Sequence, residues 1–555
     1  MATSVGKYLL DRLHHFGVNH IFGVPGDYVL RLDKMIEQHQ IHFINTTRES
    51  TAGYAADAYA RLKGLGVACI TYGVGINITN AMAQAYVESS PLIVISGTAG
   101  TDEFAKCQTR HHLINKSISV HCDTTQLEIF KQLTVDQAVL HDPETAAAEI
   151  DRVIDSCLFH KKPVYIEIPR NIVPQTIPSH HAWKKKEPAK SDQESLSEAL
   201  EETRKILQKC KRPMIWAGHE LLRDGLSQAL LQFAEKHHIP VVSSLLGKTV
   251  ISEYHPLSVG VYQGGMSPKE VCDFVESCDC ALILGVVLDD LDTGIFTAKI
   301  DQEHRVVATS KALNIGHHHF HEVLLKDYVE GLSKLDVKTP FSHPFPQSRS
   351  RIPQTFHPVV GKATTTKRLF ECIQKYLRPE HLIVADVGDC LFGAADLVLD
   401  YNSFLACAYF ASLGFGVPGA IGAQIASPDR RVVCIVGDGA FQMTATELSA
   451  AVRYHLDPIV ILLNNHGYGT ERPLLEGTYN DIQDWNYTEL PSVFGGGYGI
   501  KVTTEDGLDK ALSEAFSQRG TFYLIEVDLG KTDFSPALRR LGELLGQVVN
   551  GKKEG

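Results

Sequence analysis

The segment that most constrains the fold of this chain is residues 432–465, VVCIVGDGAFQMTATELSAAVRYHLDPIVILLNN. Its apolar run at 432–436 predicts a parallel strand buried on both faces. A helix is expected over 442–454, and a second apolar run at 459–463 predicts the next strand. Two strands joined by a helix run parallel and are connected by a right-handed crossover. The segment therefore predicts an open α/β sheet.

Polar side chains follow both of these strands. Asp438 lies in a Gly-Asp-Gly triplet after the first strand, and Asn465 lies in an Asn-Asn pair after the second. Both are expected at the carboxyl ends of neighbouring strands, where ligands bind such sheets. Carboxylate and carboxamide oxygens suit Mg²⁺, and Gly439 lets the backbone approach a phosphate closely. A Gly-Asp-Gly turn alone is most often an ordinary helix cap, but Asn465 on the next strand favours a metal–diphosphate site.

The same alternation of short apolar runs and helical stretches recurs in three blocks. The predicted strands lie at 20–24, 67–71 and 92–96, then at 213–217, 240–243 and 281–285, and finally at 382–385, 432–436, 459–463 and 522–527. Strands that alternate with helices indicate parallel, doubly wound sheets. We expect an α/β fold with three doubly wound parallel-sheet domains, over 1–178, 195–338 and 362–530, and a closing helix and tail over 531–555.

Composition argues against several other classes of protein. The net charge of -12 disfavours general nucleic-acid binding. No apolar run reaches the roughly 18 residues that a membrane helix needs. The 12 cysteines form no CxxC pair and no metal-binding spacing, which is typical of reduced thiols. We therefore expect a cytoplasmic protein that binds neither nucleic acid nor membranes.

Residues 464–471, NNHGYGTE, extend the pattern into a family resemblance. A GDG triplet followed after this interval by NN resembles the thiamine-diphosphate fingerprint, and NNHGYGTE is similar to the pyruvate, indolepyruvate and phenylpyruvate decarboxylases. The resemblance covers nearly the whole chain, in the order pyrimidine-binding, middle and diphosphate-binding domain. It implies thiamine diphosphate and Mg²⁺ as cofactors, and it makes the backbone carbonyl of Gly467 a third metal ligand beside Asp438 and Asn465.

The resemblance also implies a set of catalytic side chains. Glu49, in TRES, matches the carboxyl group that hydrogen-bonds the cofactor's aminopyrimidine. Asp27 in VPGD, His111 and His112 in TRHH, and Glu471 match the acid–base groups of the family. A histidine pair alone says little in a chain with 26 histidines, so only the flanking sequence singles out this pair.

Further residues match the cofactor contacts and the substrate pocket of the family. The expected cofactor contacts are Gly388, Asp389, Ser412, Leu413, Gly439 and Ala440, of which Leu413 matches the apolar side chain that bends the cofactor. Pyruvate-selective relatives carry bulky aromatic side chains at two pocket positions, which correspond here to Leu391, next to Phe392, and to Leu291. The smaller leucines imply a preference for aromatic, branched or longer 2-oxo acids over pyruvate.

The implied reaction is the non-oxidative decarboxylation of a 2-oxo acid to an aldehyde and CO₂ through a thiamine ylid and an enamine. The family pattern also implies a homo-oligomer, at least a dimer and commonly a tetramer. The alternative is an acetolactate-synthase-like carboligase, which usually lacks the histidine pair and the Glu471 type of residue. A non-catalytic cofactor-binding protein fits less well because Glu49 is present, and no GxGxxG motif supports a dinucleotide-dependent oxidoreductase.

Overall fold

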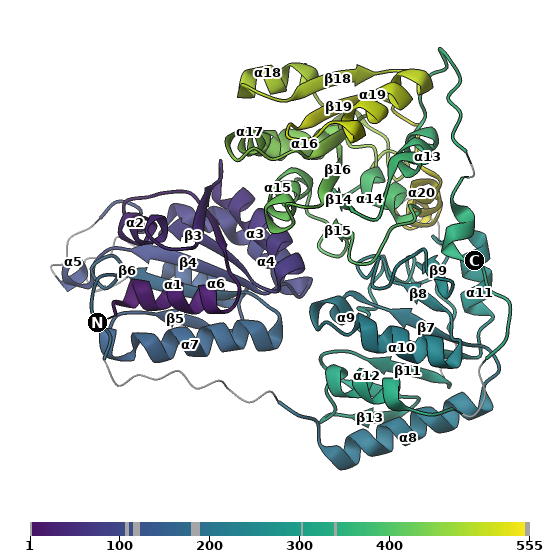
Figure 1. Cartoon of the computed structure of the whole chain (residues 1–555), viewed down its shortest axis with the longest axis horizontal. Helices are drawn as coiled ribbons and strands as arrows, with labels where there is room; N and C mark the ends of the chain where they lie inside the picture. The colour runs from purple at the N-terminus through teal and green to yellow at the C-terminus, as the bar shows by residue number, and fades with distance from the viewer. Residues whose placement is uncertain are drawn as a thin grey trace. The chain divides into compact units, whose positions relative to one another are not determined.

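The computed structural model contains three β-sheets with helices between successive strands (Figure 1). It describes residues 3–105, 110–114, 123–178, 189–300, 303–337, 341–353 and 355–549. The chain divides into two compact units. The first contains residues 1–187, 417–428 and 444–456, and the second contains the remainder. The α/β class is confirmed, and the expected domain limits stay a prediction.

The first sheet has six parallel strands in the order β2-β1-β3-β4-β6-β5. The strands are β1 His20–Gly23, β2 His42–Asn45, β3 Gly66–Thr71, β4 Leu92–Thr98, β5 Gln137–Val139 and β6 Val164–Pro169. The helices are α1 Val5–His15, α2 Leu30–Glu37, α3 Glu49–Lys63, α4 Thr79–Val87, α5 Thr101–Ala105, α6 Thr125–Lys131 and α7 Pro143–His160, with a 3₁₀ turn, η1 Val74–Ile78. Strands β3, β4 and β6 are buried along their whole length, as apolar runs in a doubly covered sheet should be.

The second sheet has seven strands in the order β13-β12-β11-β10-β7-β8-β9. They are β7 Pro213–Ala217, β8 Val241–Ser243, β9 Ser258–Val261, β10 Cys280–Leu284, β11 Arg305–Ala308, β12 Leu313–Ile315 and β13 His318–Phe320. The strands from β11 to β9 pair in parallel, whereas β12 pairs antiparallel with both β11 and β13, a departure from the expected all-parallel sheet. Only two residues join β12 to β13, and so short a loop can connect only antiparallel strands. The helices are α8 Gln193–Lys209, α9 His219–Arg223, α10 Ser227–His237, α11 Lys269–Glu276 and α12 Leu325–Lys334.

The third sheet is parallel, in the order β15-β14-β16-β17-β19-β18. Its strands are β14 His381–Ala385, β15 Phe404–Ala406, β16 Arg431–Gly437, β17 Ile459–Asn464, β18 Tyr498–Val502 and β19 Tyr523–Asp528. Its helices are α13 Thr366–Tyr376, α14 Asp389–Ala395, α15 Gly416–Ala426, α16 Asp438–Thr444, α17 Ser449–Arg453, α18 Leu490–Phe494, α19 Glu505–Ser517 and α20 Pro536–Val549. The crossover between β16 and β17 begins four residues earlier than expected and is interrupted by the 3₁₀ turn η3, Ala445–Leu448.

A buried ion pair joins segments near the second and third sheets within the second unit. Lys248 Nζ lies 2.7 Å from both carboxylate oxygens of Glu253, and the two side chains are 0% and 4% exposed. The same ammonium donates to the carbonyls of Ala395 and Leu397 at 3.1 and 2.6 Å. Removing either partner would leave a buried charge uncompensated, which costs about 3–5 kcal/mol.

Among the described helices, none is both long and apolar enough to cross a membrane.

Candidate active site

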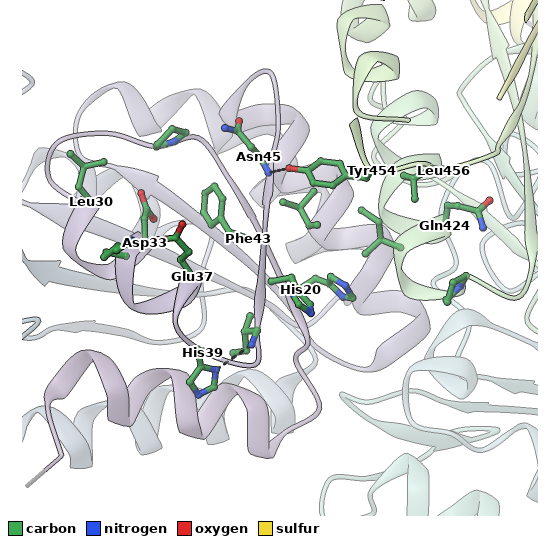
Figure 2. A pocket seen from close by; sticks show the side chains of 17 residues that line it. His20, Leu30, Asp33, Glu37, His39, Phe43, Asn45, Gln424, Tyr454 and Leu456 are labelled. Atoms are coloured by element: carbon green, nitrogen blue, oxygen red, sulfur yellow. Dashed lines mark hydrogen bonds and ion pairs between the residues drawn. The ribbon is translucent and has the colours of Figure 1, made fainter. Parts of the chain in front are cut away.

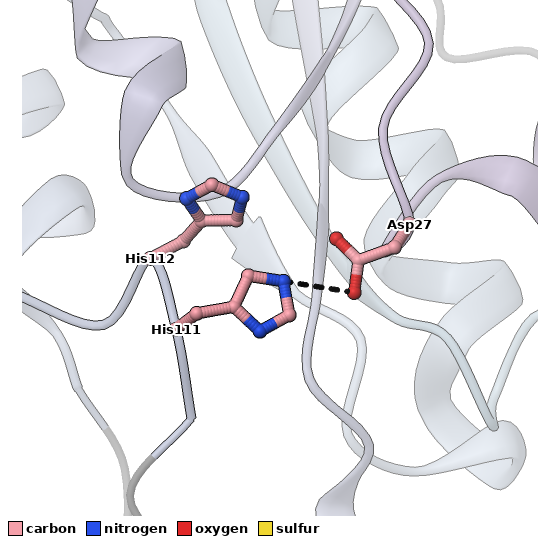
Figure 3. A group of neighbouring side chains, drawn as sticks. All are labelled: Asp27, His111 and His112. Atoms are coloured by element: carbon pink, nitrogen blue, oxygen red, sulfur yellow. Dashed lines mark ion pairs between the residues drawn. The ribbon is translucent and has the colours of Figure 1, made fainter.

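Asp27, His111 and His112 form one group of side chains in the first unit (Figure 3). Asp27 follows β1, and the two histidines lie together in a turn. His111 Nε2 lies 3.3 Å from Asp27 Oδ2, and the two imidazole centroids are 4.5 Å apart. The side chains of His111 and Asp27 are 63% and 36% exposed, so the group is accessible to a ligand.

Two residues, Tyr28 and Arg170, contact this group and help to fix its position. The Tyr28 hydroxyl donates to the carbonyl oxygen of His111 at 2.7 Å, and its ring stacks on the His111 ring with centroids 5.5 Å apart. Arg170 Nη1 lies 3.7 Å from Asp27 Oδ2 and also pairs with Glu103. Arg170 thus places a positive charge beside the carboxyl group of Asp27.

His112 adopts a left-handed backbone with φ of 67°. Such a conformation is uncommon for a residue with a side chain and is held by the surrounding contacts. A Cβ on Gly73 would lie 2.0 Å from the His112 carbonyl oxygen, so only glycine lets the turn approach so closely. The position of the histidine pair therefore depends on a glycine at 73.

Glu49 is the first residue of α3, where the helix dipole favours a negative charge. Asn77 Nδ2, in η1, donates to Glu49 Oε2 at 3.0 Å. Two residues earlier, the backbone N–H and the hydroxyl of Thr47 donate to Glu447 Oε2 at 3.0 and 2.7 Å. Glu447 is fully buried, so it anchors the segment that leads into Glu49.

Asp438, Asn465 and Gly467 lie together at the carboxyl ends of β16 and β17. The Asn465 amide nitrogen donates to the Gly467 carbonyl oxygen at 2.9 Å and to Asp438 Oδ1 at 3.2 Å. The backbone N–H of Gly467 donates to Asp438 Oδ2 and that of Gly439 to Oδ1, both at 2.8 Å. The amide group of Asn465 thus faces two hard oxygen acceptors. A rotation of this amide by 180° would turn its oxygen toward the same position, so that the three residues could offer oxygen ligands that suit a Mg²⁺ ion.

Burial shapes the chemistry of Asp438. The residue is 1% exposed, and burial raises the pKa of its carboxyl group to about 6. A Cβ on Gly439 would lie 2.7 Å from the Tyr468 ring, so the residue after Asp438 must be glycine, and the following Ala440 is buried. Burial thus makes it easier to protonate Asp438 than an exposed aspartate, and a bound cation would oppose this shift.

A second buried carboxyl group organises the turn that carries Ser412 and Leu413. The N–H groups of Gly414 and Gly416 donate to Asp386 at 3.2 and 2.7 Å. Burial raises the pKa of Asp386 to about 6. Leu413 is only partly buried at the apex of this turn, whereas Ser412 is 9% exposed. Leu413 is therefore available to contact a ligand.

Gly388 and Asp389 form the start of α14. Gly388 has φ of 98°, and a Cβ there would lie 2.7 Å from Thr470 Oγ1, next to Glu471. Asp389 Oδ2 accepts the backbone N–H of Ser535 at 2.8 Å, just before α20. Burial raises the pKa of the Asp389 carboxyl to about 6. Gly388 and Asp389 thus contact both the turn after β17 and the residue that precedes the C-terminal helix α20.

Glu471 is exposed at the end of the turn that follows β17. The neighbouring Arg472 is buried and lies 2.7 Å from both Glu476 and Asp481. These two ion pairs fix the backbone next to Glu471.

Leu391 and Phe392 are 1% and 4% exposed in the apolar core of the third sheet, and Leu291 packs against the edge of the same cluster.

A cavity of about 930 Å³ lies elsewhere in the first unit, beside the edge strand β2 (Figure 2). His20, Phe43 and Asn45 line it, together with Tyr454, whose hydroxyl accepts the backbone N–H of Asn45 at 2.6 Å. None of the predicted site residues lines this cavity. It is therefore separate from the groups described above.

Three family models match successive parts of the chain. They are the N-terminal TPP binding domain at 3–121, the central domain at 200–335 and the C-terminal TPP binding domain at 386–527 of the thiamine pyrophosphate enzymes. The chain is 35% identical over 551 residues to an indole-3-pyruvate decarboxylase of Azospirillum brasilense, covering 97% of each chain. It is 31% identical over 561 residues to an alpha-keto-acid decarboxylase of Mycobacterium tuberculosis, covering 98% and 97%, and to pyruvate decarboxylase 1 of Pisum sativum, covering 97% and 92%.

The chain belongs to the thiamine-diphosphate-dependent 2-oxo acid decarboxylases. Members of this family are carboxy-lyases, and thiamine diphosphate is the cofactor that the matching domains imply. The family resemblance inferred from the GDG and NN motifs is confirmed.

Several supporting residues of this decarboxylase were not predicted from sequence. Asn77, Arg170, Glu447 and Asp386 contact predicted site residues or the segments that carry them, yet none lies in a recognisable motif. Only Asp386 offered a local signal, because it directly follows the apolar strand β14. The other three act across long sequence separations, so periodicity does not reveal them.

Proposed function

We propose that this enzyme converts aromatic, branched or longer aliphatic 2-oxo acids to the corresponding aldehydes and CO₂, in preference to pyruvate. The observation that carries the reaction type is the Asp27–His111–His112 group. A decarboxylase must return a proton to the substrate carbon after CO₂ leaves, whereas a carboligase joins that carbon to a second carbonyl compound. An exposed acid–base group therefore favours aldehyde release.

Asp438, Asn465 and the Gly467 carbonyl would hold Mg²⁺, because the Asn465 amide lies within 3.2 Å of both other groups and its rotation by 180° would present a third hard oxygen. Thiamine diphosphate, when bound, supplies the nucleophilic carbon and the electron sink for loss of CO₂. Gly388, Asp389, Ser412, Leu413, Gly439 and Ala440 are the proposed cofactor contacts. The side chains of the protein bind and orient the cofactor and the substrate, and they transfer protons.

Two sets of side chains handle these protons. Glu49 would hydrogen-bond the aminopyrimidine, and Asn77, whose amide donates to Glu49 Oε2 at 3.0 Å, keeps that carboxyl group oriented. Asp27, His111, His112 and Glu471 deliver a proton to the substrate carbon. Positioned acid–base groups of this kind typically contribute about 10²–10⁴-fold each.

The proposed substrate preference rests on the aliphatic residues Leu291 and Leu391, with Phe392 beside them. Leucine fills less space than an aromatic ring, so a pocket bounded by these residues accepts larger apolar side chains. The relative named for indole-3-pyruvate supports this preference, the one named for alpha-keto acids does not discriminate, and the one named for pyruvate does not support it. We also propose a homo-oligomer, at least a dimer and a tetramer by the family pattern.

The test is reconstitution of metal- and cofactor-free protein. Aldehyde release is followed with phenylpyruvate, indolepyruvate, 4-methyl-2-oxopentanoate and pyruvate, with and without added Mg²⁺ and thiamine diphosphate. We expect activity only with both additions, and a higher kcat/KM for the three larger acids than for pyruvate. A hydroxy-ketone as the main product would instead favour the acetolactate-synthase-like alternative, and a pyruvate preference would overturn the substrate proposal alone.

A further inference from the structure

A second group of metal-ligating side chains lies in the middle sheet region, away from the proposed catalytic residues in sequence. Glu198 and Glu202 lie four residues apart on α8, and His318 begins β13 (Figure 1). One ligand atom of each of the three side chains lies within 4.8 Å of the others. Among the described residues, the only other such group of three is Asp27, His111 and His112.

The three side chains converge from two different elements. Residues four apart on a helix share one face, so both carboxylates point the same way from α8. His318 Nδ1 lies 3.1 Å from Glu202 Oε1, which brings the β12–β13 hairpin against this face of α8. All three side chains are at least partly exposed and can rotate. Such rotations would bring the three ligand atoms, now within 4.8 Å of one another, to the bond lengths of about 2.0–2.2 Å that a bound ion needs.

The charge of the group favours a cation over a simple ion pair. Like charges four residues apart destabilise a helix, and one imidazole carries at most one positive charge against the two carboxylates. The nearby Glu201 already has a partner, since its carboxylate lies 2.5 Å from Arg204 Nη2. Glu198 has no ion-pair partner within the part of the chain that the structure describes. A divalent ion would neutralise both carboxylates at once.

We propose that Glu198, Glu202 and His318 form a surface site for a first-row divalent metal ion, with zinc as the best fit. One imidazole nitrogen and two carboxylate oxygens are ligands that Zn²⁺ takes, with a water molecule as the fourth. Mg²⁺ is disfavoured because it prefers oxygen ligands. The bound ion would join the first helix of the middle domain to its antiparallel edge hairpin. This proposal does not depend on the proposed function.

The experiment uses the holoenzyme, with Mg²⁺ and thiamine diphosphate kept in excess throughout. Zinc chloride is titrated in equilibrium dialysis, and bound zinc is measured by mass spectrometry. The variants are Glu198→Gln, Glu202→Gln and His318→Gln. The matched control is His319→Gln, the adjacent exposed histidine, whose Nδ1 lies 2.5 Å from Asn314 Oδ1 instead of the glutamates. Any zinc bound at Asp27, His111 and His112 would be bound by every variant, so it would not change the differences between them.

We expect wild type and His319→Gln to bind one more equivalent of zinc than the other three variants, or to bind it about tenfold or more tightly. Zinc should also raise the melting temperature of wild type and His319→Gln by more than that of His318→Gln. X-ray absorption at the zinc edge should show nitrogen and oxygen ligands. Equal zinc stoichiometry, affinity and thermal response across all five proteins would overturn the proposal and leave Glu202–His318 as an ordinary surface ion pair.

Discussion

Pro473, two residues after Glu471, packs directly against Gly542 of the C-terminal helix α20. A Cβ at position 542 would lie 2.7 Å from the Pro473 Cβ and 3.2 Å from its Cγ. One helical turn later, a Cβ at 546 would lie 3.2 Å from the Pro473 carbonyl oxygen. The α20 helix is itself held by Arg540, whose Nε donates to the Met266 carbonyl at 2.6 Å. The turn that carries Glu471 is thus supported by a helix at the end of the chain.

Gly542→Ala should therefore displace the Glu471 turn. In a solvent-exposed helix this change stabilises by about 1 kcal/mol, but here the added methyl group overlaps Pro473. We expect a lower melting temperature and a kcat reduced about tenfold, since displacements of about 1 Å can cost up to 10²-fold. Gly546→Ala should have a smaller effect, and adding Pro473→Gly to Gly542→Ala should restore part of the activity. A Gly542→Ala protein that is more stable and fully active would contradict the contact.

Glu49→Gln should lower kcat by about 10² or more, because glutamine cannot exchange a proton with the aminopyrimidine. Asn77→Ala removes one hydrogen bond to Glu49, so we expect a smaller loss, up to about tenfold. Steady-state kinetics on fully loaded enzyme measure both. Glu37→Gln, on the exposed face of α2, is the matched carboxyl control and should behave as wild type. Equal effects of Glu49→Gln and Glu37→Gln would remove Glu49 from the mechanism.

Metal binding at Asp438 should depend on pH. Burial raises the pKa of this carboxyl to about 6, so the metal-free protein takes up a proton as the pH falls through that value. The proton and the cation compete for the same oxygens. The affinity should be nearly constant above pH 7 and fall about tenfold per pH unit well below pH 6.

The metal affinity at each pH is measured as Mn²⁺ binding, followed by electron paramagnetic resonance. Thiamine diphosphate is left out because its phosphates also titrate. Asp438→Asn serves as the control and should lose the high-affinity ion at every pH. An affinity that is unchanged between pH 7.5 and 5 would show that Asp438 does not bind the metal.

Leu291→Trp should narrow the proposed substrate pocket. Leu291 lies at the edge of the apolar cluster that contains Leu391, so a larger ring there can extend without breaking the core. We expect kcat/KM for phenylpyruvate to fall about tenfold or more relative to pyruvate, because apolar pockets discriminate size by about 1–3 kcal/mol. Leu246→Trp, at another edge position of the same cluster, is the control and should leave the ratio unchanged. A similar change in both variants would point to general disturbance of the core.

Much of the fold could be predicted from local patterns. The runs at 213–217 and 459–463 match β7 and β17 to within a residue, because buried strands need continuous apolar sequence. The hairpin from β12 to β13 was not predicted, since its strands are three residues long and its exposed histidines carry no alternation. The position of Asn465 beside Asp438 also followed from topology, because consecutive parallel strands end at one edge of the sheet.

The sequence by itself determined which residues end the strands, that a glycine follows Asp438, and which family the chain belongs to. These properties depend on neighbours in the chain or on motifs of fixed spacing. Only the tertiary structure decided which side chains support the site. Thr47 and Glu447 are 400 residues apart, and Pro473 meets Gly542 only because α20 returns to this turn. Such contacts arise from the packing of whole helices and strands, which the periodicity of a single segment does not encode.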